Sequence, residues 1–465
     1  MKPTISCLLA MALWTLPSCA ETGYTDWSAE PTSIRVTLSG GDKGTPDAPL
    51  DIPDGSVPYT VDLEVVSAAG GQVLTSFDGW VRMSARPGSL TIGSSVSSVV
   101  GTSVQVIAGR ASGLDVGLKG AFGTVRLWAE DLGYVPWTSG AAAACSDGAD
   151  NDGDGLIDVA DDPGCLDETD NSEEVGSFAS GISEPLYFRN LTIAEMQGKG
   201  KESPYQGEIV THDSGDMMVT RVARDGMYVT DYDDPDGYNH IFVYNFNTPA
   251  GVRVCDRLYS LAGTVVEFYG FTELGFPSWE LNPWYQEKGP CPLATPRVVT
   301  ADDLYDNAIM EPLESALVRV TDVTVSDFTV DCDHNGDGLV DFQDYDTQEC
   351  SSECECRDAC EKDSLCTEMN QYHEYGQWAV RVGGIGGEKL WVVTRETIPN
   401  HDPFGPGHPQ KLKSITGTLR NLRFLRPAWI LEPRCPDDLV VEGEPPPIGD
   451  TCIFPRTGED LYEPN

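Results

Sequence analysis

Two stretches of the chain carry oxygen-bearing side chains at the spacing of a calcium-binding loop. A twelve-residue loop of the EF-hand type takes its ligands from positions 1, 3, 5, 7, 9 and 12, and a glycine at position 6 permits the sharp turn. The sequence DNDGDGLIDVAD occupies residues 150–161, and DHNGDGLVDFQD occupies residues 333–344. Each has glycine at position 6 and an apolar residue at position 8, so we predict that each binds Ca²⁺.

The ligand set of each loop is complete in the sequence. In the first calcium loop (150–161) the predicted ligands are Asp150, Asp152, Asp154, the carbonyl of Leu156, Asp158 and Asp161. In the second calcium loop (333–344) they are Asp333, Asn335, Asp337, the carbonyl of Leu339, Asp341 and Asp344. Position 12 is Asp rather than Glu in both loops, so bidentate coordination there is less certain and the shell has room for a water. The oxygen donors suit a hard cation and not zinc.

The cysteines favour disulfides over thiol chemistry. The chain has 14 Cys; without Cys7 and Cys19, which lie in the N-terminal segment, an even number remains, as expected of an exported disulfide-bonded protein. Cys145 and Cys165 flank the first calcium loop, so we predict that they form a bridge. Proximity also suggests Cys255 with Cys291 and Cys435 with Cys452. The cluster from Cys332 to Cys366 leaves its pairing open; zinc binding by Cys354, Cys356 and Cys360 is the disfavoured alternative.

The N-terminus, MKPTISCLLAMALWTLPSC, has the pattern of an export signal. Its apolar run is too short to span a bilayer permanently. Leu-Pro-Ser-Cys at its end resembles a bacterial lipobox, in which the cysteine is lipidated. We therefore expect a signal peptide over 1–19, a membrane anchor through lipid at Cys19, a tether over 20–30, and an outer-membrane or cell-surface location. Cleavage near Ala20 or Glu21 without lipidation is the alternative.

The residue pattern of the remaining chain predicts a mainly β protein. Residues 31–137 alternate apolar and polar side chains between Gly, Ser and Pro breaks, which predicts an Ig-like β-sandwich. Residues 145–174 contain 12 acidic residues and no basic one. We interpret this acidic segment as a calcium-binding, Cys-flanked linker, because such a composition cannot bury a core unaided.

Two related β domains follow, over residues 178–297 and 312–434. The sequences SLAGTV from Ser260 and SITGTL from Ser414 occur at the same late place in each, which indicates a duplication. Each domain has about five predicted strands, the number in a small Greek-key barrel. The second contains a Cys-rich insertion over 331–368 with the second calcium loop. A Pro- and acid-rich tail covers 435–465.

Two family resemblances carry these expectations further. CSDGADNDGDGLIDVADDPGC resembles the acidic, Cys-flanked DNDGDG repeats of myxobacteria-type surface lipoproteins. The runs DGMYVTDY, VCDRLYSLAGTVVEF and PRVVTADDLYDNAIMEPLESALVRVTDVTV resemble OB-fold modules that accompany secreted nucleases. This second resemblance implies two OB-like barrels. It covers the barrels alone, and since such a fold hosts many ligands it implies no nuclease activity.

A catalytic centre is not evident in the sequence. The chain has six His and neither an H-E-x-x-H nor a G-x-S-x-G motif. The formal charge of −44 argues against a nucleic-acid partner, because such a chain repels phosphate. We predict a non-catalytic, calcium-stabilised surface lipoprotein that binds or displays an extracellular protein, peptide or glycan. The alternatives are single-stranded nucleic-acid binding or a nuclease-accessory role, and a calcium-assisted hydrolase of unrecognised type.

Overall fold

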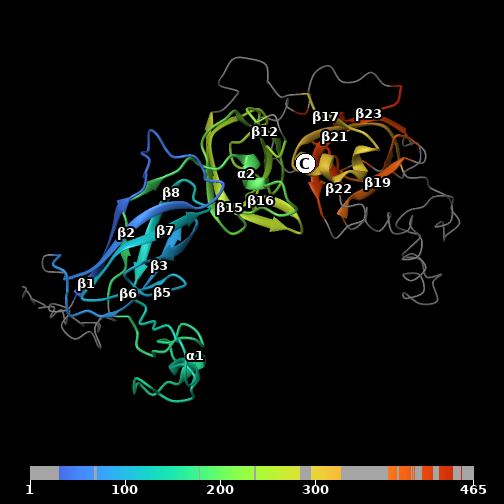
Figure 1. The fold of residues 1–465 in the computed structure, drawn as a ribbon. Coiled ribbons are helices and arrows are strands. Elements are labelled where there is room, and N and C mark those ends of the chain that lie inside the picture. The colour runs from blue at the N-terminus through green and yellow to red at the C-terminus, as the bar shows by residue number, and fades with distance from the viewer. Residues whose placement is uncertain are drawn as a thin grey trace, which may run out of the picture. The chain divides into compact units, whose positions relative to one another are not determined.

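The computed structural model describes residues 31–67, 71–176, 178–234, 237–282, 295–325, 375–384, 387–399, 401, 403, 411–422, 429–443 and 452. The chain divides into two compact units, Met1–Phe188 and Arg189–Asn465. Both are built mainly from β-strands, which confirms the predicted structural class (Figure 1). Among the described residues, none of the helices combines the length and the apolar character that a membrane span requires.

The first unit consists of two β-sheets. The four-stranded sheet has the order β1-β2-β7-β4, and the second has the order β10-β8-β3-β6-β5, with β9 also paired to β8. The strands of the first sheet are β1 (Pro31–Gly40), β2 (Val57–Ser67), β7 (Arg110–Lys119) and β4 (Ser89–Gly93). Those of the second are β3 (Gly79–Arg86), β5 (Val99–Val100), β6 (Ser103–Val106), β8 (Thr124–Glu130), β9 (Gly181–Ile182) and β10 (Leu186–Tyr187).

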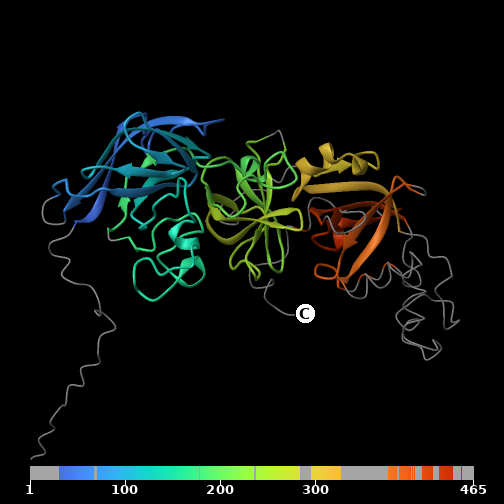
Figure 2. The ribbon, with the colours of Figure 1, turned by 60° about the horizontal axis from the view of Figure 1, so that its bottom comes forward.

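The alternation in the sequence explains how these sheets bury one core. Successive side chains of a strand point to opposite faces, so every second residue of β2 is available to the interior. Val61, Leu63 and Val65 are fully buried and share a core with Val81 and Met83 of β3 and with Leu127 of β8. Both sheets therefore contribute to the same hydrophobic core (Figure 2).

The acidic segment is an insertion in this unit and not a linker after it. The chain leaves β8, forms η1 (Ala144–Ser146) and α1 (Asp158–Asp161), and returns to pair β9 and β10 with β8. Phe188 also packs into the core of the unit. The first unit thus extends to Phe188, beyond the sandwich boundary of 137 and the barrel start of 178 that the sequence suggested.

The second unit contains two closed five-strand barrels. In the first barrel β12 pairs with β13, β13 with β14, β14 in parallel with β16, β16 with β15, and β15 with β12. The helix α2 (Ile193–Gln197) packs against it, and Gln197 Nε2 donates to the carbonyl of His240 at 2.6 Å. The strands are β11 (Ile209–His212), β12 (Met217–Val222), β13 (Gly226–Asp231), β14 (His240–Tyr244), β15 (Arg257–Phe268) and β16 (Phe271–Asn282).

The second barrel repeats this connectivity. β18 pairs with β19, β19 with β20, β20 in parallel with β22, β22 with β21, and β21 with β18. The elements are β17 (Arg297–Val299), η3 (Asp303–Tyr305), α3 (Asn307–Met310), η4 (Glu311–Leu313), β18 (Leu317–Val325), β19 (Gln377–Val382), β20 (Glu388–Val393), β21 (Lys411–Asn421), β22 (Trp429–Glu432), η7 (Pro436–Asp438) and β23 (Leu439–Val441).

The repeated glycine of the two barrels has a physical reason. Gly263 of β15 and Gly417 of β21 lie in the fourth strand of each ring, where the fifth strand approaches closely. A Cβ at Gly417 would lie 2.5 Å from the carbonyl oxygen of Glu432, and one at Gly263 would lie 3.0 Å from that of Gly275. The same packing need therefore accounts for the matched SLAGTV and SITGTL sequences.

Several sequence predictions fall outside the described residues. These are the signal peptide, the lipidated Cys19, the tether, Cys291, the second calcium loop with its six ligands, and the insertion over 331–368. They stay predictions. Of the tail, the structure describes 435–443 and Cys452, and the bridge between Cys435 and Cys452 is present with an S–S distance of 2.11 Å. Cys255 is also disulfide-bonded.

Candidate calcium site

The first calcium loop brings three predicted ligands together. One carboxylate oxygen each of Asp150, Asp152 and Asp154 lies within 4.8 Å of the others, and all three side chains are exposed. The loop's own backbone orients them: Asp150 accepts from the N–H groups of Gly153 (2.6 Å) and Gly155 (3.1 Å). Gly155, at position 6, has a φ of 96°, a left-handed conformation that glycine adopts without steric cost.

The remaining predicted ligands of this loop are placed differently. The Asp158 carboxylate accepts from the N–H of Gly148, with both oxygens at 3.1 Å. Asp161 lies at the end of α1, and Leu156 is 38% exposed. The structure therefore assembles positions 1, 3 and 5 and does not group Asp158 or Asp161 with them.

The disulfide predicted from the loop's flanking residues is present. Cys145 and Cys165 are joined with an S–S distance of 2.03 Å and a Cα–Cα distance of 5.6 Å. Both are buried, although the loop between them is exposed. The bridge holds the two ends of the calcium loop together, which reduces the conformational freedom that an ion must overcome on binding.

Three buried acids next to the first calcium loop, Asp162, Asp170 and Glu173, were not predicted as site residues. Glu173 is 2% exposed and accepts from the N–H of Asn151 and, at 3.1 Å, from the N–H of Asp158. It therefore contacts both ends of the first calcium loop from outside it. The only sequence signal for this role is the acid-rich run that follows Cys165, since charged residues are ordinarily expected at the surface.

Asp170 anchors the insertion to the unit. It is fully buried and accepts from the backbone N–H groups of Val135 (3.0 Å), Ser172 (3.1 Å) and Leu166 (3.4 Å). Burial raises the pKa of Asp170, and these hydrogen bonds oppose that increase. A hollow of about 340 Å³ lies nearby, lined by residues that include Asp147, Asp152 and Glu173.

The two barrels meet through buried charges that the sequence did not reveal. Arg221 of β12 binds the Glu432 carboxylate of β22 and donates to Thr418 Oγ1 at 2.7 Å. The Tyr228 hydroxyl donates to Glu432 at 2.9 Å, and Arg420 lies 3.6 Å from the same carboxylate. We call these four residues, Arg221, Tyr228, Arg420 and Glu432, the interface cluster. Burial acts to raise the pKa of Glu432, but the two arginines outweigh it and lower the pKa.

His212 is part of a buried pair and not of a cleft. Its Nδ1 lies 3.0 Å from the Leu191 carbonyl oxygen, and its Nε2 lies 3.0 Å from Asp231 Oδ2. Each ring nitrogen therefore has an oxygen within hydrogen-bond distance. His212 is 1% exposed, which supports a structural role for this side chain.

The first barrel exposes a row of aromatic side chains, which we call the aromatic patch. Tyr244, Phe246 and Phe276 form a row with ring-centroid distances of 4.6 Å and 5.4 Å. Phe246 is 54% exposed and Phe276 75%, and both have left-handed backbones with φ of 61° and 50°. Such conformations strain a bulky residue and are associated with functional sites. By contrast, Tyr228 and Phe242 are buried in the barrel.

Comparison with known proteins returned no match: no protein-family model, curated protein or solved structure matches this chain.

Proposed function

We propose that this protein is a non-catalytic, calcium-stabilised surface lipoprotein that binds or displays an extracellular protein, peptide or glycan. The convergence of Asp150, Asp152 and Asp154 within 4.8 Å, in a loop whose ends are joined by Cys145–Cys165, is the observation that carries the proposal. Converging oxygen donors on a constrained loop are what a hard cation requires. The ion would be Ca²⁺, and its role would be structural.

A structural role follows from where the loop lies. The first calcium loop belongs to an insertion of the first unit, and the chain after it supplies β9 and β10. A sensor pairs two such loops between helices and exposes a groove when it binds calcium. Here the one helix of the loop is the four-residue α1, so binding would hold the insertion in place and not open a groove.

Thermal unfolding with calcium and with a chelator tests this role. An ion that binds only the folded chain raises its stability by RT ln(1 + [L]/Kd), about 2.7 kcal/mol at a hundredfold excess over Kd. We expect a higher melting temperature in calcium, and an Asp152→Ala/Asp154→Ala variant should lose the part of the difference that the first calcium loop contributes. Glu168→Gln removes one exposed charge from the same segment and should behave as the wild type. Equal melting with and without chelator would refute the proposal.

The binding part of the proposal concerns the aromatic patch. Each barrel has the strand order expected of an OB-like module: a three-strand meander, a parallel pairing of the third and fifth strands, and closure through the fourth. Exposed phenyl rings on such a barrel stack on sugar rings or pack against apolar side chains. We propose that Tyr244, Phe246 and Phe276 form the binding surface for a glycan or protein.

Single-stranded nucleic acid is the second candidate, and the exposed aromatics are the observation in its favour, since bases stack on such rings. The net charge of −44 opposes it. Binding assays with oligonucleotides and with a glycan panel separate the two, using Phe276→Ala as the variant and Tyr259→Ala as the control. Tyr259 serves as the control because it is 58% exposed and lies on β15, outside the aromatic patch. Retention of oligonucleotides at 150 mM salt that depends on Phe276 would favour the second candidate.

A further inference from the structure

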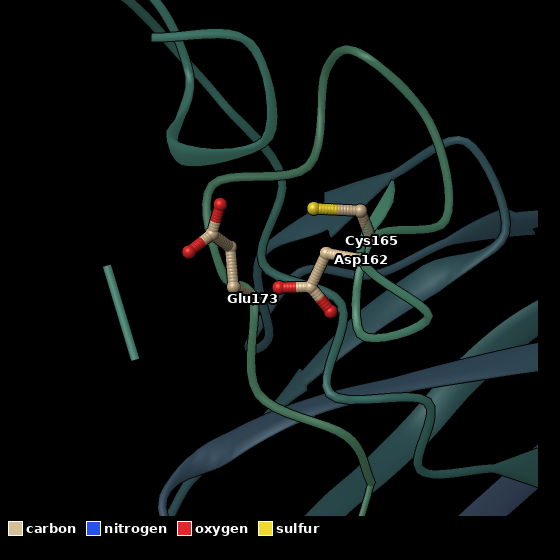
Figure 3. A group of neighbouring side chains, drawn as sticks. All are labelled: Asp162, Cys165 and Glu173. Carbon is tan, nitrogen blue, oxygen red and sulfur yellow. The ribbon is translucent and has the colours of Figure 1, made fainter. Parts of the chain in front are cut away.

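Two carboxylates are buried together beneath the first calcium loop. Asp162 is 4% exposed and Glu173 is 2% exposed, although neither belongs to the ligand set of the loop. One oxygen of each lies within 4.8 Å of the other and of the Cys165 sulfur. Figure 3 shows the three side chains entering the same region from two stretches of the acidic segment. Because Cys165 is in the disulfide, its sulfur offers no thiolate, and the donors are oxygens.

Asp162 has an oxygen that is buried without a partner. Its Oδ1 accepts from the N–H of Gly164 at 2.7 Å. Its Oδ2 has no hydrogen-bond partner within the described part of the chain. Leaving a buried acceptor unsatisfied costs roughly 1–3 kcal/mol, and more when the group is charged. This oxygen is therefore free to bind a cation.

The acidic segment itself supplies no positive charge to the pair. The segment 145–174 contains no Lys or Arg, and the described ion pairs include neither carboxylate. Glu173 accepts hydrogen bonds from the backbone N–H groups of Asn151 and Asp158. These bonds leave the unpartnered oxygen of Asp162 as it is. Two nearby carboxylates in a buried setting repel one another, and a divalent cation between them removes both the repulsion and the unsatisfied oxygen.

We propose that Asp162 and Glu173 form a second divalent-cation site, separate from the first calcium loop and selective for hard cations such as Ca²⁺. Oxygens bound to one Ca²⁺ lie 2.3–2.6 Å from the ion and so at most about 5 Å apart. The spacing of the two carboxylates, within 4.8 Å, fits this limit.

Occupancy of this site is coupled to the loop above it. Glu173 receives the N–H groups of Asn151 and Asp158, which are positions 2 and 9 of the first calcium loop. An ion that holds the Glu173 carboxylate in place therefore also holds the backbone of the loop. Coupling of this kind is reciprocal, so calcium in either site raises the affinity of the other. The site rests on the proposed function only in the choice of Ca²⁺ as the ion.

Counting bound Ca²⁺ by native mass spectrometry of the full chain tests the proposal. We expect Asp162→Asn to bind one Ca²⁺ fewer than the wild type, and Asp162→Glu to restore it. Glu174→Gln is the matched control, because Glu174 is the exposed neighbour of Glu173, and it should bind as the wild type does. An equal count for Asp162→Asn and Glu174→Gln would overturn the second site.

A variant with both loops disabled provides a test that does not depend on the folding of Asp162→Asn. In Asp152→Ala/Asp337→Ala we expect one Ca²⁺ to remain at 1 mM free calcium, and its loss on adding Glu173→Gln. If none remains, the second site does not exist. If Asp152→Ala alone binds as many ions as the wild type, the loop site fails while the count for Asp162→Asn still decides the second site.

Discussion

The contacts of the interface cluster allow a quantitative prediction about the stability of the second unit. Arg221 is 4% exposed, and the bulge at Thr220 in β12 places it opposite Tyr228, with its guanidinium carbon 5.2 Å from the centre of that ring. Arg221→Met keeps the volume and removes the charge. The Glu432 carboxylate then keeps Arg420 at 3.6 Å and the Tyr228 hydroxyl, but it loses its closest cation.

The expected loss can be worked out from these contacts. Removing one partner of a buried ion pair destabilises a protein by roughly 3–5 kcal/mol. Because Arg420 remains beside Glu432, we take the lower end, about 3 kcal/mol, for Arg221→Met. Glu432→Gln leaves the buried Arg221 and the partly buried Arg420 without their carboxylate, so we expect a larger loss of about 4–5 kcal/mol. The double variant should lose less than the sum, by about 2 kcal/mol, because the two residues contact each other directly.

Urea unfolding of the full chain, followed by tryptophan fluorescence, measures these differences. At about 2–4 °C per kcal/mol, Arg221→Met should also melt about 6–12 °C lower. Arg224→Met is the control: Arg224 is 82% exposed and 4.0 Å from Glu396, and an exposed pair of this kind contributes at most about 1 kcal/mol. A loss below about 1 kcal/mol for Arg221→Met, or strict additivity in the double variant, would refute the argument.

Three further outcomes follow from the same structure. Burial raises the pKa of Glu273 to about 7. The stability that Glu273 contributes is therefore fully present below about pH 4.5 and is lost as the pH rises through 7. Glu273→Gln should reduce that loss by about 3 kcal/mol, measured by melting at different pH values. Gly417→Ala should lower the melting temperature, because its Cβ would lie 2.5 Å from a carbonyl oxygen of the fifth strand. The control is Gly251→Ala at an exposed position, where a Cβ meets nothing within 4 Å but the backbone φ is 73°. This control should lose about 1 kcal/mol of stability. Cys165→Ser should weaken calcium binding by the chain in titration calorimetry, since the ends of the loop are then free, and unchanged affinity would contradict a constraining role for the bridge.

Much of the fold is visible in local sequence patterns. Alternation in β2 follows from one face being buried, so the period of two predicts both the strand and its core residues, Val61 and Leu63. The bridge between Cys145 and Cys165 was predictable because the loop between them must close on itself. The repeated Ser-x-x-Gly-Thr sequence marked the fourth strand of both barrels because both need the same close approach of backbones.

Other features have no local signal. Strands β9 and β10 are two residues each, too short to show a period, and this is why the end of the first unit was placed too early in the sequence. Asp162 and Glu173 look like surface acids in a segment full of them. Arg221 and Glu432 are 211 residues apart, and only the closure of two separate barrels brings them into contact. Such contacts depend on tertiary packing, which no window of sequence contains.

The return of the chain to β8 after the acidic insertion has a mechanical consequence. If tension is applied to the chain beyond Phe188, it acts first on the pairing of β10 with β8 and reaches the insertion only after β9 and β10 have detached. At that stage the Cys145–Cys165 bridge withholds a segment with a sequence separation of 20, which is roughly 70 Å of contour length at full extension. Extension of the insertion under tension therefore has two stages. Strand pairing resists the first stage, and the disulfide resists the second.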